Sequence, residues 1–216
     1  MNKTAGTKPR PRVKPGRVVI ISSPSGGGKS SICRRLLSRK RRNDGWQFSV
    51  SYTTRSRRPG ERNGREYFFV SEDEFQQLVK KNFFAEHFPV HLYHYGTPRK
   101  PLDNVRHNGG VMLLDVDVQG AFRLKKEYPD AITIFVLPPS ITELRRRLKR
   151  RGTETREQLQ VRFENAKREM RLYGRFEYAV VNQDLDLATR QVLCIIEAHF
   201  CRTERLKGEQ IKKIAG

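Results

Sequence analysis

Cysteine, long apolar runs and acidic residues near the start are all scarce in this 216-residue sequence. The three cysteines, Cys33, Cys194 and Cys201, cannot all pair with one another and none lies in a CxxC spacing, which argues against a disulfide framework or a cysteine-rich metal site. No apolar run approaches the roughly 20 residues of a membrane-spanning helix, and residues 1–14 hold no apolar segment of a secretory signal. These absences predict free thiols and a location in the reducing cytoplasm.

Acidic residues are outnumbered along the chain, with 44 Lys and Arg against 23 Asp and Glu and a formal net charge of +21. Residues 1–16 combine cations with three prolines and almost nothing to bury, so they are predicted to form a disordered basic tail. A basic field attracts nucleotides and nucleic acids alike. Charge alone therefore leaves two explanations open: improved solubility, or adhesion of nucleic acid to the tail.

Apolar segments alternate with amphipathic stretches through most of the chain. Continuous apolar runs predict buried strands at 17–21, 111–116, 131–137 and 178–181. Helical spacing is legible at 31–37, 141–151, 156–172 and 185–205. Strands that alternate with helices predict an α/β fold with a mainly parallel sheet.

The composition and the hydrophobic pattern of the sequence change between residues 47 and 96. Aromatic residues and short alternating runs at 48–52 and 66–70 indicate strands of a different kind. We expect a small, more antiparallel unit to be inserted here.

A glycine-rich loop follows the first predicted strand. Residues 23–30, SPSGGGKS, fit the Walker A pattern GxxxxGK[ST] except that Ser23 replaces the first glycine. Such a loop directs backbone N–H groups and a helix N-terminus at phosphate, with Lys29 on the β- and γ-phosphates and the Ser30 hydroxyl on Mg²⁺. The predicted ATP-binding residues of this segment are Ser25, Gly26, Gly27, Gly28, Lys29, Ser30 and Ser31. A plain Gly/Ser turn before a helix is the alternative.

The departure at Ser23 makes a conformational prediction. A serine at positive φ would be strained. We expect Ser23 to lie at negative φ and to leave phosphate binding intact.

An arginine-rich segment opens the inserted unit. Residues 51–61, SYTTRSRRPGE, followed by GREY at 64–67, resemble the guanylate kinase signature, in which a serine precedes TTRxxRxGE and a tyrosine. The resemblance extends from about Val18 to about Leu206, and its motifs keep the family's order. It implies a P-loop nucleoside monophosphate kinase that transfers the γ-phosphoryl group of ATP to GMP, and to dGMP.

The same resemblance implies a division of the chain. A core P-loop domain would comprise 17–50, 101–137 and 168–213, a GMP-binding insert 51–100, and a lid 138–167.

Arginine suits the phosphate of a nucleoside monophosphate because its planar fork makes two charge-assisted hydrogen bonds. The resemblance implies that Arg55 and Arg58 hold the GMP phosphate, with hydroxyl donors from Tyr67 and Tyr95. Without the resemblance, the simpler interpretation is that the arginines lie in a solvated basic turn and that the tyrosines pack half-exposed on the surface. Glu61 would either orient the arginines or form a surface salt bridge.

Guanine presents N–H donors at N1 and N2, which call for a carboxylate, and an O6 acceptor, which calls for a hydroxyl. The resemblance implies that Glu86 pairs with the N1/N2 edge with help from Asp117, while Ser51 and Thr97 address O6. Adenine presents an acceptor at N1, so a carboxylate at Glu86 disfavours AMP.

Asp115 ends the strand at 111–116, which is where open α/β sheets place their chemistry. It fits a Walker B-like role, either near Mg²⁺, directly or through water, or in steering Arg55. Capping of the turn at 119–120 is the alternative reading.

Two further segments resemble the family. Arg147, Arg151 and Arg162 align with its lid arginines, which stabilise charge on the transferring phosphoryl group. With Lys29 and Arg55 they complete the set of predicted catalytic residues. Asn182 lies in a segment like the one beside the family's adenine pocket, and an N-cap at Asp184 is a compatible alternative.

Two other functions were weighed against the kinase. Guanylate kinase-like domains of scaffolding proteins bind peptides, but typically with degraded loops and lids, whereas Lys29, Ser30, Arg147, Arg151 and Arg162 are present here. Related sugar-phosphate kinases keep the P-loop without the guanine site, which the residues proposed for GMP argue against.

Overall fold

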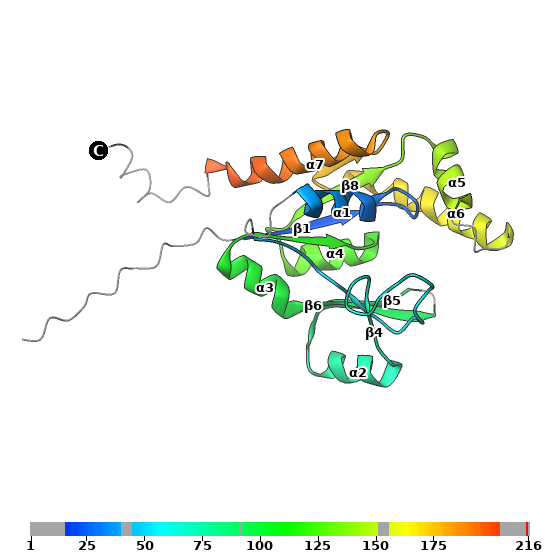
Figure 1. Cartoon of the computed structure of the whole chain (residues 1–216), viewed down its shortest axis with the longest axis horizontal. Helices are drawn as coiled ribbons and strands as arrows, with labels where there is room; N and C mark the ends of the chain where they lie inside the picture. The colour runs from blue at the N-terminus through cyan, green and yellow to red at the C-terminus, as the bar shows by residue number, and fades with distance from the viewer. Residues whose placement is uncertain (1–15, 40–44, 91, 151–155, 204–214, 216) are drawn as a thin grey trace, which may run out of the picture.

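The computed structural model describes residues 16–39, 45–90, 92–150, 156–203 and 215 of the chain. Arg151 and the predicted basic tail, apart from Gly16, lie outside these ranges. The described residues form two β-sheets with helices packed around them (Figure 1).

The central sheet has five strands in the order β2-β7-β1-β8-β9, and every pairing in it is parallel. The strands are β1 (Arg17–Ser22), β2 (Trp46–Phe48), β7 (Val111–Asp115), β8 (Ile132–Leu137) and β9 (Tyr178–Val181). The four strands predicted from continuous apolar runs are therefore confirmed to within about a residue at each end, as is the mainly parallel α/β fold. Such runs are apolar on both sides because helices cover both faces of a parallel sheet.

Alternate residues of β1 show how the two faces are covered. Val18 and Ile20 pack in one core cluster with residues of α3 (Arg99–Asn108) and α4 (Val118–Glu127). Val19 and Ile21 pack in the other cluster with residues of α1 (Lys29–Arg39) and α7 (Leu185–Phe200). Val19, Ile20 and Ile21 are completely buried, so this strand lies at the centre of the domain.

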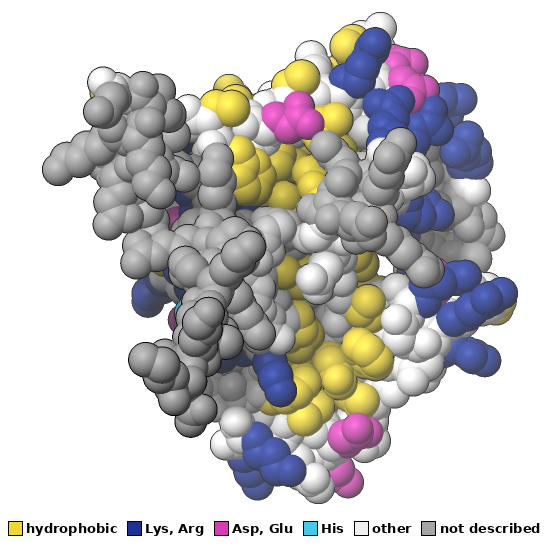
Figure 2. All heavy atoms as spheres, turned by 60° about the vertical axis from the view of Figure 1, so that its left-hand side comes forward, with side chains coloured by type: hydrophobic (Ala, Val, Ile, Leu, Met, Phe, Trp, Pro, Cys, Tyr) yellow, Lys and Arg dark blue, Asp and Glu magenta, His cyan; other side chains and the backbone are white. Residues whose placement is uncertain are grey.

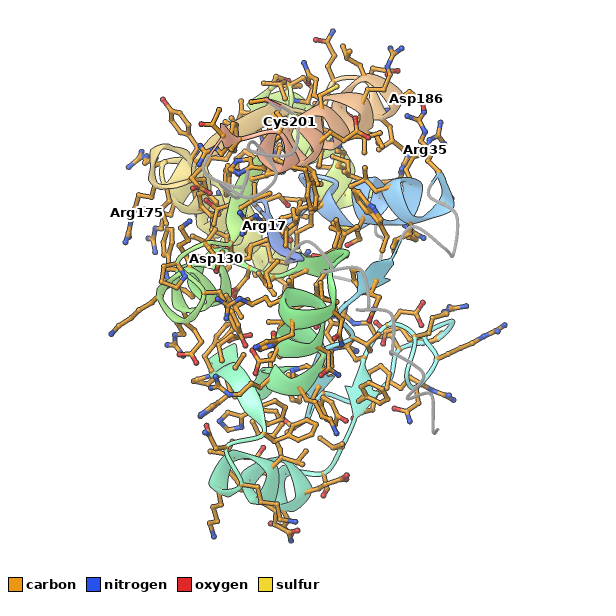
Figure 3. The ribbon with its side chains drawn as sticks, turned by 90° about the vertical axis from the view of Figure 1, so that its left-hand side faces the viewer. Arg17, Arg35, Asp130, Arg175, Asp186 and Cys201 are labelled. Atoms are coloured by element: carbon orange, nitrogen blue, oxygen red, sulfur yellow. The ribbon has the colours of Figure 1, made fainter. Side chains whose placement is uncertain are left out.

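Ion pairs on the surface accompany this packing. Arg35 of α1 lies beside Asp186 of α7, with 3.0 Å between Nε and Oδ1 (Figure 3). At the start of β1, Arg17 Nη1 lies 3.1 Å from Asp130 Oδ2. Both carboxylates are substantially exposed, so each pair adds little to stability compared with the apolar clusters beneath it.

The second sheet has the order β4-β3-β6-β5 and is mostly antiparallel. It comprises β3 (Tyr52–Thr53), β4 (Phe68–Phe69), β5 (Phe84–Val90) and β6 (Tyr93–Pro98), with α2 (Glu72–Lys80) packed against it. The fully buried Phe75 of α2 stacks on Phe84, with ring centroids 4.7 Å apart. In Figure 1 this unit lies below the central sheet, which confirms the prediction of a small, more antiparallel insertion.

Two expectations about the insertion were wrong in detail. The predicted strand 48–52 is divided: β2 pairs with β7 in the central sheet, whereas β3 pairs with β6 in the second. The predicted strand 66–70 shrinks to Phe68–Phe69. The alternating pattern was real, but partners distant in sequence decide where a strand ends.

Three of the four predicted helices begin and end within about two residues of their predicted bounds, whereas the helix predicted over 185–205 ends at Phe200. Besides α1 and α7, the predicted helices are α5 (Ile141–Lys149) and α6 (Arg156–Met170), which pack on each other through a third apolar cluster, Leu144, Leu148, Phe163 and Ala166. A short 3₁₀ turn, Tyr173–Arg175, follows α6. The sequence interpretation did not single out α2, α3 or α4. None of the described helices is both long enough and apolar enough to cross a membrane.

Basic side chains are prominent on one face of the molecule. On the face shown in Figure 2, Lys and Arg side chains gather mainly near the edges, with apolar side chains exposed between them. The charge excess of the sequence is thus visible on the folded part of the chain.

Truncation of Ile20 tests the position of the core. Ile20→Ala is expected to lower the free energy of unfolding by about 2–5 kcal/mol, because it opens a cavity in the fully buried central strand. Urea denaturation would measure this change. Leu92, which is 89% exposed, is the matched control, and Leu92→Ala should stay within about 0.5 kcal/mol of the parent. Equal losses in both variants would contradict this description of the core.

Candidate active site

The glycine loop between β1 and α1 has a conformation that requires glycine at two positions. Gly26 and Gly28 have φ of +88° and +100°. A Cβ on Gly28 would also lie 2.2 Å from Asn182 Nδ2. Any side chain at Gly28 would therefore be strained and would collide with the segment after β9.

Ser23 occupies the first loop position without left-handed strain. Among the described residues, Asn82 is the only one other than glycine with positive φ, so the negative φ expected of Ser23 is confirmed, while its effect on phosphate binding stays a prediction. Its buried hydroxyl donates to the Pro24 carbonyl at 2.9 Å. Its side chain lies close to Gly27, where an added Cβ would approach Ser23 Cβ to 2.7 Å.

The two polar residues that open α1 meet Asp115 at the end of β7. Lys29 Nζ lies 3.4 Å from Asp115 Oδ1, and the Ser30 hydroxyl donates a short hydrogen bond to Asp115 Oδ2. The alternative reading of Asp115 as a cap is wrong, because Asp117 caps α4 by accepting the Gly120 N–H at 2.8 Å.

Arg55 is the most constrained cation of the insertion. Its guanidinium is buried, and Nη2 donates to both carboxylate oxygens of Glu61 at 2.8 and 3.0 Å. Burial opposes the charge, but Glu61 and Tyr95 outweigh it and raise the pKa of Arg55. The Tyr67 ring centroid lies 5.6 Å from the guanidinium carbon. Glu61 also accepts the Arg58 backbone N–H at 2.8 Å, so it orients this turn instead of forming a surface salt bridge.

One pocket joins the glycine loop to the arginine turn. It has a volume of about 920 Å³. Its lining includes Lys29, Ser30 and Asp115 on one side and Ser51, Arg55, Arg58, Tyr67 and Tyr95 on the other. The cation of the loop thus shares a cavity with a second group of cations contributed by the insertion.

Glu86 and Thr97 form a buried polar pair across β5 and β6. They are register partners, and Thr97 Oγ1 donates to Glu86 Oε1 at 2.6 Å. Glu86 is 7% exposed and its Oε2 atom has no protein partner. Burial raises the pKa of Glu86 to about 7, and the nearby Asp117 carboxylate adds to the increase. A buried carboxylate with a vacant acceptor oxygen is suited to a ligand that brings N–H donors.

The residues predicted to recognise the base do not all line the same cavity. Ser51 lines the 920 Å³ pocket, whereas Glu86, Thr97 and Asp117 lie outside its lining. Burial is also the main cause of the raised pKa of Asp117.

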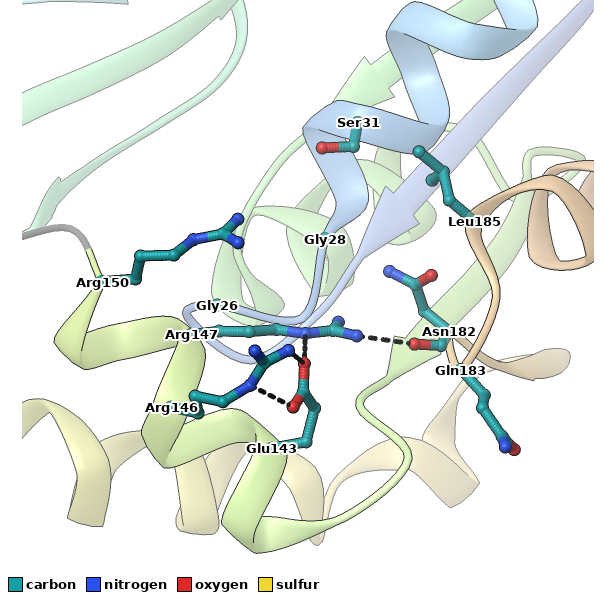
Figure 4. Close-up of a pocket in the computed structure, with 10 residues that line it drawn as sticks. All are labelled: Gly26, Gly28, Ser31, Glu143, Arg146, Arg147, Arg150, Asn182, Gln183 and Leu185. Carbon is teal, nitrogen blue, oxygen red and sulfur yellow. Dashed lines mark hydrogen bonds and ion pairs between the residues drawn. The ribbon is translucent and has the colours of Figure 1, made fainter.

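A second, smaller pocket of about 380 Å³ lies beside the loop, between it, α5 and the segment after β9 (Figure 4). Its lining includes Gly26, Gly28, Ser31, Arg147 and Asn182. Arg147 Nη2 donates to the Asn182 carbonyl at 3.0 Å, and Asn182 Nδ2 donates to the Gly27 carbonyl at 3.0 Å. The N-cap expected at Asp184 is confirmed, because Asp184 accepts the Leu187 N–H at the start of α7.

Two carboxylates near the loop were missed by the sequence interpretation. Glu143 accepts Arg147 Nε at 2.7 Å, and the i,i+4 spacing of this pair was the available signal. Glu169 accepts the Ser25 N–H at 3.2 Å, a contact between distant segments that left no local signal. Arg162, which was predicted, donates from Nη2 to the Ser25 hydroxyl at 2.7 Å.

Comparisons with known proteins agree with this geometry. A model of the guanylate kinase family matches residues 15–199. A guanylate kinase from Clostridium tetani is 42% identical over 89% of this chain and 90% of its own length. One from Yersinia pestis is 44% identical over 89% of this chain and 92% of its own.

A solved structure supports the same assignment. The crystal structure of guanylate kinase from Anaplasma phagocytophilum is 31% identical and superposes with a TM-score of 0.75, covering 91% of this chain and 93% of its own. The chain therefore belongs to the guanylate kinase family, a family of nucleoside monophosphate kinases that phosphorylate GMP with ATP.

Proposed function

We propose that this chain transfers the γ-phosphoryl group of ATP to GMP, and to dGMP, across the 920 Å³ pocket. The observation that carries the proposal is that Lys29 of the loop and Arg55 and Arg58 of the insertion line this one cavity. Two anion sites that face each other can align a donor and an acceptor phosphate for in-line attack. No general base is needed, because the acceptor phosphate is already substantially ionised near neutral pH.

On the donor side, we assign ATP to the loop and the pocket behind it. Backbone N–H groups of the loop and Lys29 would hold the phosphates, and Asn182 would lie beside the adenosine. The assigned residues are Ser25, Gly26, Gly27, Gly28, Lys29, Ser30, Ser31 and Asn182.

Phosphoryl transfer in this family uses a divalent metal ion, which we assign as Mg²⁺ at Ser30 and Asp115. A hydroxyl and a carboxylate that already meet at the end of β7 supply the hard oxygen ligands that Mg²⁺ prefers. When bound, the ion would neutralise charge on the phosphates. Lys29, which lies 3.4 Å from the same carboxylate, would stay within reach of the transferring group.

On the acceptor side, we assign the GMP phosphate to Arg55, Arg58, Tyr67 and Tyr95. Glu61 fixes one of these cations in advance, which lowers the entropic cost of binding. We assign the guanine base to Ser51, Glu86, Thr97 and Asp117. The vacant Glu86 Oε2 supports this choice, because guanine N1–H and N2–H can donate to it.

Cations from the lid would complete the site. Lys29, Arg55, Arg147, Arg151 and Arg162 are the proposed catalytic residues, because each can offset negative charge on the transferring group.

The proposed division into a core (17–50, 101–137 and 168–213), a GMP-binding insert (51–100) and a lid (138–167) follows from these roles. We also propose that the enzyme acts in the cytoplasm. Adhesion of nucleic acid to residues 1–16 stays a separate prediction, which a steep salt dependence would test.

A nucleotide panel with Glu86→Gln tests the base assignment. A glutamine amide turns an N–H group toward guanine, so kcat/KM for GMP should fall about 10–100-fold, as expected for one lost charged hydrogen bond. A coupled assay with GMP, dGMP, AMP and UMP would measure it, with the exposed Glu74→Gln as control. Turnover of AMP by the parent as fast as GMP would overturn the assignment.

The raised pKa of Glu86, about 7, predicts a pH dependence. Only the ionised carboxylate accepts both guanine donors, so the KM for GMP should fall as pH rises from 6 to 8 and then level off. The GMP phosphate titrates in the same pH range, at about pH 6. The KM of Glu86→Gln should therefore retain only the pH dependence that comes from the phosphate. Identical profiles for variant and parent would exclude Glu86 from the titration.

The same group predicts a stability effect of defined sign. Because the folded pKa lies above the unfolded value, ionisation of Glu86 penalises the folded state as pH rises from about 4.5 through 7. Glu86→Gln should therefore gain stability relative to the parent across that range. Urea denaturation at pH 5 and pH 8 would measure the difference, and an unchanged difference would contradict it.

Glu61→Ala tests whether Arg55 must be held in advance. The kcat/KM for GMP should fall at least about tenfold, because the guanidinium loses a bidentate partner and its fixed orientation. Steady-state kinetics with GMP varied would show the loss. The control Glu127→Ala, which removes the exposed partner of Arg99, should change kcat/KM for GMP less than about twofold. Equal values of kcat/KM in the two variants would exclude a role of Glu61 in the site.

A further inference from the structure

The carboxylate of Glu169 contacts the glycine loop from the far end of α6. Its Oε2 atom accepts the Ser25 backbone N–H at 3.2 Å. The hydroxyl of the same serine accepts a hydrogen bond from Arg162 Nη2 at 2.7 Å. Two residues of α6 therefore hold the backbone and the side chain of one loop residue.

Helix geometry explains why both can reach Ser25. Residues seven apart lie on the same face of an α-helix, about two turns or 10.5 Å along its axis. The pair Arg162 and Glu169 has this spacing. Contact with α5 is close as well, since a Cβ on Gly26 would lie 3.2 Å from atoms of Leu144 and Leu148. The loop is thus held against α5 and α6 at two successive residues.

The stability of α6 does not explain a carboxylate at this position. Glu169 is the penultimate residue of the helix, where the helix dipole disfavours negative charge. It is also partly buried, and this burial raises its pKa, whereas Lys29 and Arg162 favour the ionised form. The fold therefore keeps an acceptor at a site that is costly for an anion, and its neighbours there are the loop and the cations of the donor site.

We propose that Glu169 is a positioning residue for phosphoryl transfer, which fixes the Ser25 backbone against α6 and so sets the position of Arg162 relative to the loop. This inference rests on the proposed role of Arg162. The required feature is an acceptor oxygen at the reach of a glutamate side chain. Its loss leaves the GMP site untouched, so the defect falls on kcat and not on the KM for GMP.

Two conservative variants test separately the length and the charge of the Glu169 side chain. Glu169→Gln keeps an acceptor oxygen at the same reach without the charge, and Glu169→Asp keeps the charge on a chain one methylene shorter. The expected result is a kcat at least about tenfold lower for Glu169→Asp and within about threefold of the parent for Glu169→Gln, since small misplacements are costly in transfer reactions. The KM for GMP should stay within about twofold in both.

Glu164→Gln is the matched control. Glu164 lies on the same helix, is half-exposed and pairs with Lys167, away from the loop, so its variant should behave as the parent. A parent-like kcat in Glu169→Asp, a larger loss in Glu169→Gln than in Glu169→Asp, or a parallel change of kcat and the KM for GMP would each overturn the proposal.

Hydrogen exchange at the Ser25 amide gives a readout that needs no turnover. In the nucleotide-free full-length protein, exchange of this amide should be faster in Glu169→Asp and unchanged in Glu169→Gln and Glu164→Gln. Equal exchange in all four proteins would overturn the contact itself. A failure of the proposed function would look different, because the parent would then not phosphorylate GMP while the exchange pattern persisted.

Discussion

The parallel pairing of β1 with β7 is the constraint on which the site depends. Its register places Ile21 beside Asp115, and the Val116 N–H continues the pairing by donating to the Ile21 carbonyl at 3.3 Å. The chain leaves both strands at the same edge of the sheet, so the glycine loop after β1 begins next to the carboxylate that ends β7. Lys29 and Ser30 then meet Asp115 without any further adjustment of the backbone. A slip of one residue would turn Asp115 toward the other face of the sheet.

The proposed acceptor side is built on a shorter strand and is stabilised differently. Arg55 follows a strand of only two residues, β3, so regular structure alone cannot aim its side chain. Glu61, the Ser56 carbonyl and the Tyr67 ring surround the guanidinium instead. A buried cation is tolerable only when its donors are satisfied. The same contacts that offset the cost of burying the Arg55 charge also hold its guanidinium in one orientation, which the proposed binding of a phosphate requires.

How much could be predicted from the sequence depended on whether the signal was local. The strands of the central sheet could be predicted because parallel strands are apolar on both faces. The loop could be predicted because glycines precede Lys29. The division of residues 46–53 between two sheets was not, since the pairing of Trp46–Phe48 with β7 is set by residues over sixty positions away. On sequence grounds Asp115 was a candidate to cap the turn at 119–120, and only the fold shows that Asp117 caps α4 instead.

Contacts between distant segments account for most of what the sequence could not show at the site. Glu169 had no recognisable pattern, because its partner is a backbone N–H of residue 25. The pairing of Glu86 with Thr97 likewise follows from the β5–β6 register. The resemblance to a known family supplied the roles of Glu86 and Thr97, but not of Glu169, as expectations, and those roles stay proposals until variants are measured.

The loop itself shows how such contacts orient the backbone of the proposed phosphate site. The Gly27 carbonyl accepts Asn182 Nδ2 at 3.0 Å and Arg147 Nη1 at 3.5 Å. In a trans peptide the C=O and the following N–H point in opposite directions. Because the carbonyl is held toward Asn182, the N–H of Gly28 is turned to the other side of the loop and is not available to that segment. The residues after β9 and on α5 thus orient the loop backbone before any nucleotide arrives, and the low cost of reorganisation follows from their contacts with a carbonyl, not with the phosphate.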